Sequence, residues 1–197
     1  MPDPRLAFFA GRAPEWDAMM PPDLPNQLAE MLAPFAGGIA SAGRMIEIGT
    51  GTGALVAPLR ALNPTAALLA FDLAWPMLRL ARGKGLAATF ICGDAHRLPL
   101  PAATADLVLC HNSFPHFRDA DSALGEIRRV LRPGGRLLIL HNQSREAVNA
   151  IHARVGGAVA HDLLPDAASL REQLGRMRYT EIMINDNDQR FTAICER

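Results

Sequence analysis

Three histidines follow apolar runs in this sequence, at places where a buried strand would give way to a loop. The run DLVLC (106–110) leads to His111 and then, within NSFPHF, to His116, and the run LLIL (137–140) leads to His141. An imidazole titrates near neutral pH, so it can take a proton from a substrate. These three side chains are the candidate catalytic groups. A contact with the substrate alone, a backbone contact between His111 and a cofactor, or no role at all would also account for them.

A glycine-rich segment, EIGTGTG (47–53), joins the first apolar run to a helical pattern. Gly49, Gly51 and Gly53 allow a tight turn and a close approach of the backbone to a ligand. Such a loop delivers the ligand to free N–H groups at the start of a helix. Taken alone, the loop also fits a dinucleotide site or a purely structural turn.

Three carboxylates accompany this loop at the ends of successive apolar runs. Glu47 precedes the glycines, Asp72 ends the run ALLAFD, and Asp94 follows ICG. Asp72 is placed to bind two ribose hydroxyls, Asp94 the amino group of an adenine, and Glu47 a cationic amine. Any one of them could be a helix cap or a solvated charge. Three at successive strand ends favour a ligand at this edge of a sheet.

Bringing these side chains to one edge requires parallel strands. Short, nearly continuous apolar runs alternate with patterns of helical period, as expected for strands covered on both faces. This alternation predicts a doubly wound α/β sheet. The predicted strands are 44–49, 67–72, 88–94, 105–111 and 136–141, and the predicted helices are 54–62, 75–82 and 119–132, the last stopped by Pro133-Gly134-Gly135.

The chain is predicted to form a single domain, 1–197. An N-terminal cap (1–40) precedes a cofactor-binding core (44–141), and residues 142–197 supply helices on the substrate side and a closing β-hairpin. Those last elements are predicted as helices at 144–155 and 166–177 and strands at 179–185 and 190–196.

Five segments, in their order and spacing, resemble the small-molecule group of class I S-adenosylmethionine-dependent methyltransferases. They are EIGTGTG, FDLAWPMLRLAR, ICGDAHRLPLP, ADLVLCHNSFPHF and EIRRVLRPGGRLLIL, within residues 44–140. The resemblance implies a seven-stranded, mostly parallel, Rossmann-like sheet in the order 3-2-1-4-5-7-6 with an N-terminal helical cap. It also implies S-adenosyl-L-methionine as cofactor and S-adenosyl-L-homocysteine as product.

The resemblance further implies which residues contact the cofactor. Glu47 and the glycines would line its methionine part, Asp72 its ribose and Asp94 its adenine, while His111 would begin the wall that faces the substrate. The segment FFAGRAPEWDAMM resembles the family's lid, although its aromatics fit plain core packing equally well. The full cofactor-binding set is Glu47, Gly49, Thr50, Gly51, Gly53, Asp72, Leu73, Asp94, Ala95, His96 and His111.

The amino-acid composition limits the classes of molecule that this protein is expected to bind. Formal charge balances to zero, with no basic stripe of the kind that binds nucleic acid. No apolar run approaches the roughly 20 residues that span a bilayer, and no signal peptide is visible, so we expect a cytoplasmic protein that is a monomer or homodimer. Cys92, Cys110 and Cys195 lie in predicted strands and are expected to be buried, unpaired core residues.

The sequence therefore predicts an enzyme that transfers a methyl group to a small molecule. A nicotinamide oxidoreductase of the short-chain type is disfavoured because Tyr179 has no lysine four residues later. A nucleic-acid amino-methyltransferase is disfavoured because Asn112-Ser113-Phe114-Pro115 departs from its motif. The alternative is a non-catalytic cofactor-binding module. A metal held by His141, His152 and His161 is conceivable, but no metal ligand is assigned.

Overall fold

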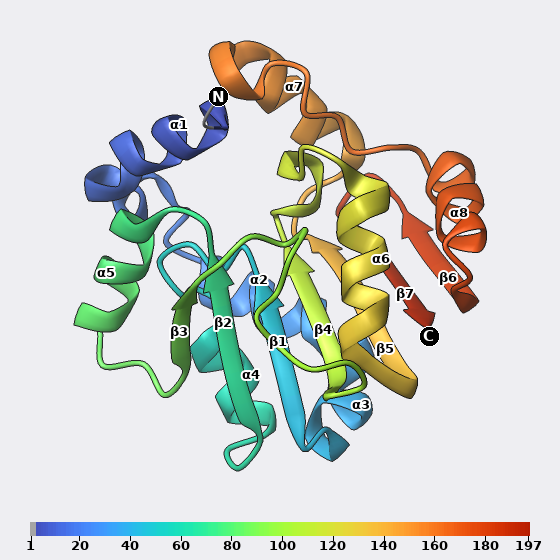
Figure 1. The fold of residues 1–197 in the computed structure, drawn as a ribbon. Helices are drawn as coiled ribbons and strands as arrows, with labels where there is room; N and C mark the ends of the chain where they lie inside the picture. Colours follow the sequence, from blue (N-terminus) through green and yellow to red (C-terminus); the bar gives the residue numbers. More distant parts are fainter. Residues whose placement is uncertain (1–2) are drawn as a thin grey trace.

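The computed structural model describes residues 3–197 and shows one twisted sheet between two layers of helices (Figure 1). Within these residues the sheet has seven strands in the order β3-β2-β1-β4-β5-β7-β6. Strands β1 to β5 pair in parallel, and β7 pairs antiparallel with both β5 and β6. The predicted fold class, its strand order and its antiparallel closing hairpin are confirmed.

The central strands are covered on both faces, which explains why their apolar runs are nearly continuous. In β1, Met45 packs into one core, whereas Ile46 and Ile48 pack into the core on the opposite side. The strands are β1 (Arg44–Ile48), β2 (Ala67–Asp72), β3 (Thr89–Cys92), β4 (Ala105–His111), β5 (Leu131–His141), β6 (Thr180–Asp186) and β7 (Phe191–Glu196).

Each face of the sheet has its own set of helices (Figure 1). On one face lie α2 (Leu24–Leu32), α3 (Ala36–Ser41), α4 (Val56–Leu62) and α5 (Trp75–Gly83). On the other lie α6 (Ala120–Val130) and α8 (Ala167–Arg176). The apolar residues that predicted α4, α5, α6 and α8 are the ones that cover the sheet.

Two helices lie instead above the carboxyl edge of the parallel strands (Figure 1). They are α1 (Pro4–Arg12) and α7 (Arg145–Val155), and α1 contacts the short 3-10 helix that follows α7, Gly157–Val159. The predicted N-terminal cap therefore has two parts, because α1 covers this edge while α2 and α3 cover a face. Met1 and Pro2 of that cap lie outside the described residues.

The junction between α6 and β5 differs from the prediction. The helix ends at Val130, and Leu131 already pairs with Ala105 as part of β5. The register then shifts, so that Leu107 pairs with Arg136. Pro133, Gly134 and Gly135 therefore form an irregularity inside one long strand, whereas the sequence predicted a loop between a helix and a shorter strand.

The cysteine prediction is correct for two residues and wrong for the third. Cys110 and Cys195 are buried in the sheet, but Cys92 is exposed. Cys92 ends β3, which is the edge strand, so one side of it has no neighbouring strand to cover it. Across residues 3–197, no helix combines the length and the apolar character needed to cross a membrane.

Candidate functional site

Two cavities open at the carboxyl edge of the sheet. The aspartate cavity is lined by Asp72 and Asp94 and is covered by α1. The histidine cavity is lined by His111, His141 and His152. The two share a wall made of Trp16, Gly49, Gly51, Asn112 and His116. A reactive group held in one cavity can therefore meet a molecule held in the other.

The cavities differ in size. The histidine cavity has a volume of about 650 Å³, within the range of typical small-molecule sites. The aspartate cavity measures only about 130 Å³, because Leu6, Phe9 and Trp16 from the N-terminal segment close over it. A nucleoside-sized ligand needs more room, so we expect this segment to shift outward when such a ligand binds.

The glycine loop after β1 is pinned to the neighbouring strands. The N–H groups of Gly49 and Thr50 both donate to the carbonyl oxygen of Phe71, at 2.8 and 2.9 Å. Gly49 has φ +76°, and an added Cβ would lie 2.3 Å from Cβ of Ser113. The Ser113 hydroxyl donates to the carbonyl of Ile48 at 2.7 Å. Position 49 therefore requires glycine both for its backbone angle and for its close approach to the segment after β4.

Asp72 fixes the same loop from β2. Its carboxylate accepts the N–H groups of Gly51 and Ala74, each at 2.8 Å. Burial raises the pKa of Asp72, even though these N–H groups act in the opposite direction. Leu73, the next residue, lines the aspartate cavity with it. The carboxylate thus lies on the cavity wall with its orientation already set.

Glu47 is a carboxylate in the core of β1, with a fractional exposure of 1%. The Thr50 hydroxyl donates to it at 2.8 Å, and within residues 3–197 no cationic side chain pairs with it. Burial raises the pKa of Glu47 to about 7, opposed by the Thr50 hydrogen bond and reinforced by nearby Asp72. Glu47 lines neither cavity, but Thr50 lies above it on the wall of the histidine cavity.

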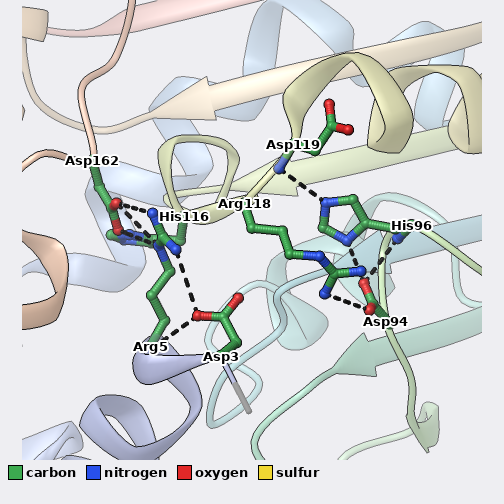
Figure 2. A network of polar contacts seen from close by, with 8 residues as sticks. All are labelled: Asp3, Arg5, Asp94, His96, His116, Arg118, Asp119 and Asp162. Carbon is green, nitrogen blue, oxygen red and sulfur yellow. Dashed lines mark hydrogen bonds and ion pairs between the residues drawn. The ribbon is translucent and has the colours of Figure 1, made fainter. Parts of the chain in front are cut away.

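Asp94 is held by a second network at the end of β3 (Figure 2). It accepts the His96 N–H at 2.9 Å and Arg118 Nη1 at 2.9 Å, and it also contacts Nδ1 of His96. Burial alone would raise the pKa of Asp94, but these donors outweigh it and lower the pKa. The N–H of Asp119 donates to Nε2 of His96 at 3.3 Å, so Nδ1 carries the proton toward Asp94. Asp94, Ala95 and His96 all line the aspartate cavity.

His141 is a buried imidazole, and His111 is a partly buried one whose Nε2 atom is buried. Burial lowers the pKa of His111 to about 4, and burial together with the nearby histidines lowers that of His141 well below its usual value. In the described part of the chain, Nε2 of each ring has no hydrogen-bond partner. Both residues line the histidine cavity. A bound molecule with a hydroxyl or carbonyl group could supply the missing partners.

His116 has a different environment. Its Nδ1 lies 2.8 Å from Oδ2 of Asp162, a carboxylate with a side-chain exposure of 1% (Figure 2). Arg5 of α1 binds the same carboxylate through Nε, at 3.0 and 2.9 Å, and through Nη2, at 2.5 Å. Burial would raise the pKa of Asp162, but His116 and Arg5 lower it. The sequence pointed to His116; it did not indicate Arg5, and it singled out Asp162 only with His161, as a residue turned back toward the site.

Aromatic side chains of the N-terminal segment complete this region. Phe9 packs edge-on against His116, with 4.9 Å between ring centroids, and against Trp16 at 5.7 Å. Just beyond, Asp17 pairs with Lys84 at 2.7 Å. Phe9 and Trp16 therefore contact the site itself, whereas Phe8 packs on Phe9 and lies beneath the guanidinium of Arg12.

The surroundings of three residues that the sequence singled out are as follows, and the roles predicted for them stay predictions. Gly53 faces the interior, because an added Cβ would lie 2.7 Å from Leu86. His111 lines the histidine cavity and not the aspartate cavity. His161 is exposed, and within residues 3–197 no group of three or more histidine, cysteine or acidic side chains is arranged to hold a metal. The loop after α7 brings Asp162, and not His161, to the site.

A parallel sheet with a glycine loop after β1 and acids at the ends of β2 and β3 defines a class of nucleoside-binding α/β domains. Comparison with known proteins identifies the family. Residues 46–139 match a family described as "Methyltransferase domain". Demethylmenaquinone methyltransferase of Thermus thermophilus is 43% identical over 101 residues, covering 49% of this chain and 46% of that protein. Ubiquinone/menaquinone biosynthesis C-methyltransferase UbiE of Syntrophotalea carbinolica is 32% identical over 145 residues, covering 72% and 60%.

Solved structures agree on the fold. A Methanococcus maripaludis protein superposes with a TM-score of 0.75 at 22% identity, covering 98% of this chain and 93% of that one. A SAM-dependent methyltransferase from Aquifex aeolicus gives a TM-score of 0.70 at 19% identity, covering 94% and 97%. Residues 46–139 therefore form a class I S-adenosylmethionine-dependent methyltransferase domain, as the five motifs predicted. The matched part of this chain covers 46%, or about half, of the length of the Thermus relative.

Proposed function

We propose that this protein transfers a methyl group from S-adenosylmethionine to a small-molecule acceptor. The observation that carries the proposal is the wall shared by the two cavities, which includes Gly49, Gly51 and His116. In this arrangement the cofactor occupies the aspartate cavity, the acceptor occupies the histidine cavity, and the reacting atoms meet at the shared wall. Such alignment is the main contribution that an enzyme makes to an in-line displacement.

The residues of the aspartate cavity fit the cofactor. Asp72 would hold the ribose hydroxyls, and Asp94 with Ala95 and His96 would bind the adenine. Glu47 lines neither cavity, but next to the glycine loop it is a buried carboxylate without a cationic partner in the described chain, which suits a ligand that carries positive charge nearby. When bound, S-adenosylmethionine supplies a methyl group on a positively charged sulfur, which leaves as a neutral thioether.

The acceptor we propose is an aromatic ring that bears oxygen, as in quinone precursors. Two observations support this class. The histidine cavity combines apolar walls with the neutral rings of His111 and His141, which can exchange hydrogen bonds with hydroxyl or carbonyl oxygens. The relatives cited above are named for methylation in menaquinone or ubiquinone biosynthesis. The apolar wall residues are Met19, Met20, Leu24, Met31, Val148 and Ile151.

Methyl transfer to such a molecule also requires a side chain that can take up one proton. The molecule that takes up the methyl group would gain a bond to carbon and would lose a proton in return. The proton released by the acceptor passes to a ring nitrogen at the shared wall. We assign this role to Nε2 of His116, because the ring lines both cavities. His111 and His141 orient the acceptor's oxygen atoms.

The test begins with calorimetric titration by S-adenosylmethionine and S-adenosylhomocysteine, followed by incubation with an acceptor panel. The panel contains a short-chain demethylmenaquinol, its O-methylated analogue and a malonyl thioester, the last because a malonyl-[acyl-carrier protein] O-methyltransferase is also 43% identical over 101 residues. We expect micromolar cofactor binding and a mass gain of one CH2 on a ring carbon of the quinol. Cofactor binding with no methylated product would favour the non-catalytic alternative. Absence of binding would refute the cofactor assignment.

A further inference from the structure

His116 and Arg5 share the buried carboxylate of Asp162. The three residues come from separate parts of the chain: Arg5 from α1, His116 from the segment after β4, and Asp162 from the loop after α7 (Figure 2). The guanidinium engages both carboxylate oxygens, while Nδ1 of His116 lies 2.8 Å from one of them. A carboxylate this buried is stable only when its lone pairs are satisfied, so its position determines where both partners lie.

We propose that Asp162 is a positioning residue for the reaction and that, through Arg5, it links closure of α1 to the alignment of His116. The inference rests on the proposed function, because it assigns to Asp162 the task of preparing the ring nitrogen that receives the acceptor's proton. Asp162 itself lines neither cavity.

The geometry selects one tautomer of His116. The carboxylate can only accept a hydrogen bond, so the neutral ring must carry its proton on Nδ1. Nε2 then keeps its lone pair, and in the part of the chain that the structure describes it makes no hydrogen bond. Phe9 packs against one side of the ring, and His152 lies beside it with 4.8 Å between centroids. The ring is thus held in place with a basic nitrogen available at the wall shared by the cavities.

Arg5 gives the carboxylate a permanent positive partner. The charge of Asp162 is therefore balanced by Arg5, and Nδ1 of His116 adds a hydrogen bond to the same carboxylate. Arg5 and Leu6 also line the aspartate cavity, so the same helix that covers that cavity completes this arrangement. The other charged or titratable groups near His116 are Asp3, Asp72, His141 and His152.

The first test is spectroscopic and needs no acceptor. In protein with 15N-labelled histidine and bound S-adenosylhomocysteine, two-bond correlations between ring protons and nitrogens report the tautomer of each ring, and His116→Gln identifies the His116 signals. We expect the Nδ1–H form in the native protein and a large gain of the Nε2–H form in Asp162→Asn. If native His116 is in the Nε2–H form, the inference is overturned, and this holds even if Asp162→Asn does not fold.

The second test separates positioning from binding. Asp162→Asn should lower kcat at least tenfold, less than the roughly 10²- to 10⁴-fold that a general base contributes because the His116 ring remains. It should weaken S-adenosylhomocysteine binding no more than Arg5→Gln does, because both variants remove the same ion pair. Asp166→Asn is the matched control, since Asp166 only caps α8 and asparagine caps equally well. An unchanged kcat in Asp162→Asn would overturn the inference. If the native protein methylates no acceptor, the proposed function fails, and the tautomer measurement still decides the role of Asp162.

A third variant tests whether Arg5 links the position of α1 to Asp162. Arg5→Gln should retain the Nδ1–H tautomer but weaken S-adenosylhomocysteine binding roughly threefold to tenfold, because the closed position of α1 loses a partly exposed, two-oxygen ion pair. It should also speed amide hydrogen exchange in residues 4–12 of the ligand-bound protein. Unchanged affinity together with unchanged exchange would show that Arg5 does not link α1 to the site.

Discussion

Replacing Glu47 by glutamine should make the ligand-free protein more stable at neutral and alkaline pH. Glu47 is buried in β1, and its carboxylate has one neutral hydrogen-bond partner, the Thr50 hydroxyl. Ionisation there requires a negative charge in a poorly solvated place with Asp72 nearby. Glutamine has nearly the same shape and can still accept the Thr50 hydrogen bond, so the change removes the charge with little effect on packing.

The size and sign of the effect follow from the pKa of Glu47, which folding raises from 4.5 to about 7. At ~1.36 kcal/mol per tenfold change in an ionisation constant, this difference corresponds to roughly 3 kcal/mol. Between these two pH values the folded state holds more protons than the unfolded state, so native stability falls as pH rises. The advantage of Glu47→Gln should therefore be below about 1 kcal/mol at pH 5 and approach roughly 3 kcal/mol at pH 8.

The assay is urea unfolding of both proteins, followed by circular dichroism at several pH values between 5 and 8. The free energy of unfolding will vary with pH for other reasons too, so the test is the difference between the variant and the native protein. Glu172→Gln is the control, because Glu172 is exposed on α8 and its loss should leave the two curves parallel. Parallel curves for Glu47→Gln would refute the argument that ionised Glu47 is costly.

Three further predictions concern the walls of the cavities. Asp72→Ala should weaken S-adenosylhomocysteine binding more than tenfold in calorimetry, on the order of 1.4 kcal/mol or more, because two charge-assisted hydrogen bonds to the ribose are lost; unchanged affinity would exclude a ribose contact. His111→Ala should keep cofactor affinity within about threefold while reducing methyl transfer, and a large loss of affinity would place His111 against the cofactor instead. Gly49→Ala should lower the free energy of unfolding by at least ~2 kcal/mol in urea, since it combines positive φ with a clash against Ser113; Ser113→Gly should recover only the part due to the clash.

The doubly wound α/β sheet could be predicted from the sequence because its signals are local, whereas the strand order came from the resemblance to a family. Each parallel strand is a short apolar run, and each connection contains one helical pattern. The prediction of the junction between α6 and β5 was wrong, because the same residue types are compatible with two different backbone structures. The segment Arg132-Pro133-Gly134-Gly135 has the residues of a helix stop followed by a turn, but Gly134, with φ +74°, and its neighbours form an irregularity within β5. The pairing of Leu131 with Ala105 favours the continuous strand over the turn. These two residues are far apart in the sequence, so local patterns do not reveal their contact.

The residues of the site likewise fall into those that local sequence signals could predict and those that they could not. Asp72 and Asp94 end strands, and the carboxyl ends of parallel strands meet at one edge, so topology alone brings them to one cavity. The contact between Arg5 and Asp162 joins residues 157 positions apart through a terminal helix and an irregular loop. No periodicity or motif reports such a pair. The one available signal was the pair Gly156-Gly157, with φ +69° and +60°, which turns the chain back before Asp162.

The unpartnered nitrogens of His111 and His141 suggest that the histidine cavity is kept for a polar ligand at a cost in stability. A buried polar group without a partner costs roughly 1–3 kcal/mol, and in residues 3–197 both Nε2 atoms fall in this category. Buried polar groups are nearly always paired in native proteins, so two exceptions in one cavity require an explanation. Phenylalanine or leucine at these positions would avoid the cost. A ligand that brings oxygen atoms to both rings would instead recover it on binding, and the recovered energy would favour oxygen-bearing acceptors over purely apolar ones.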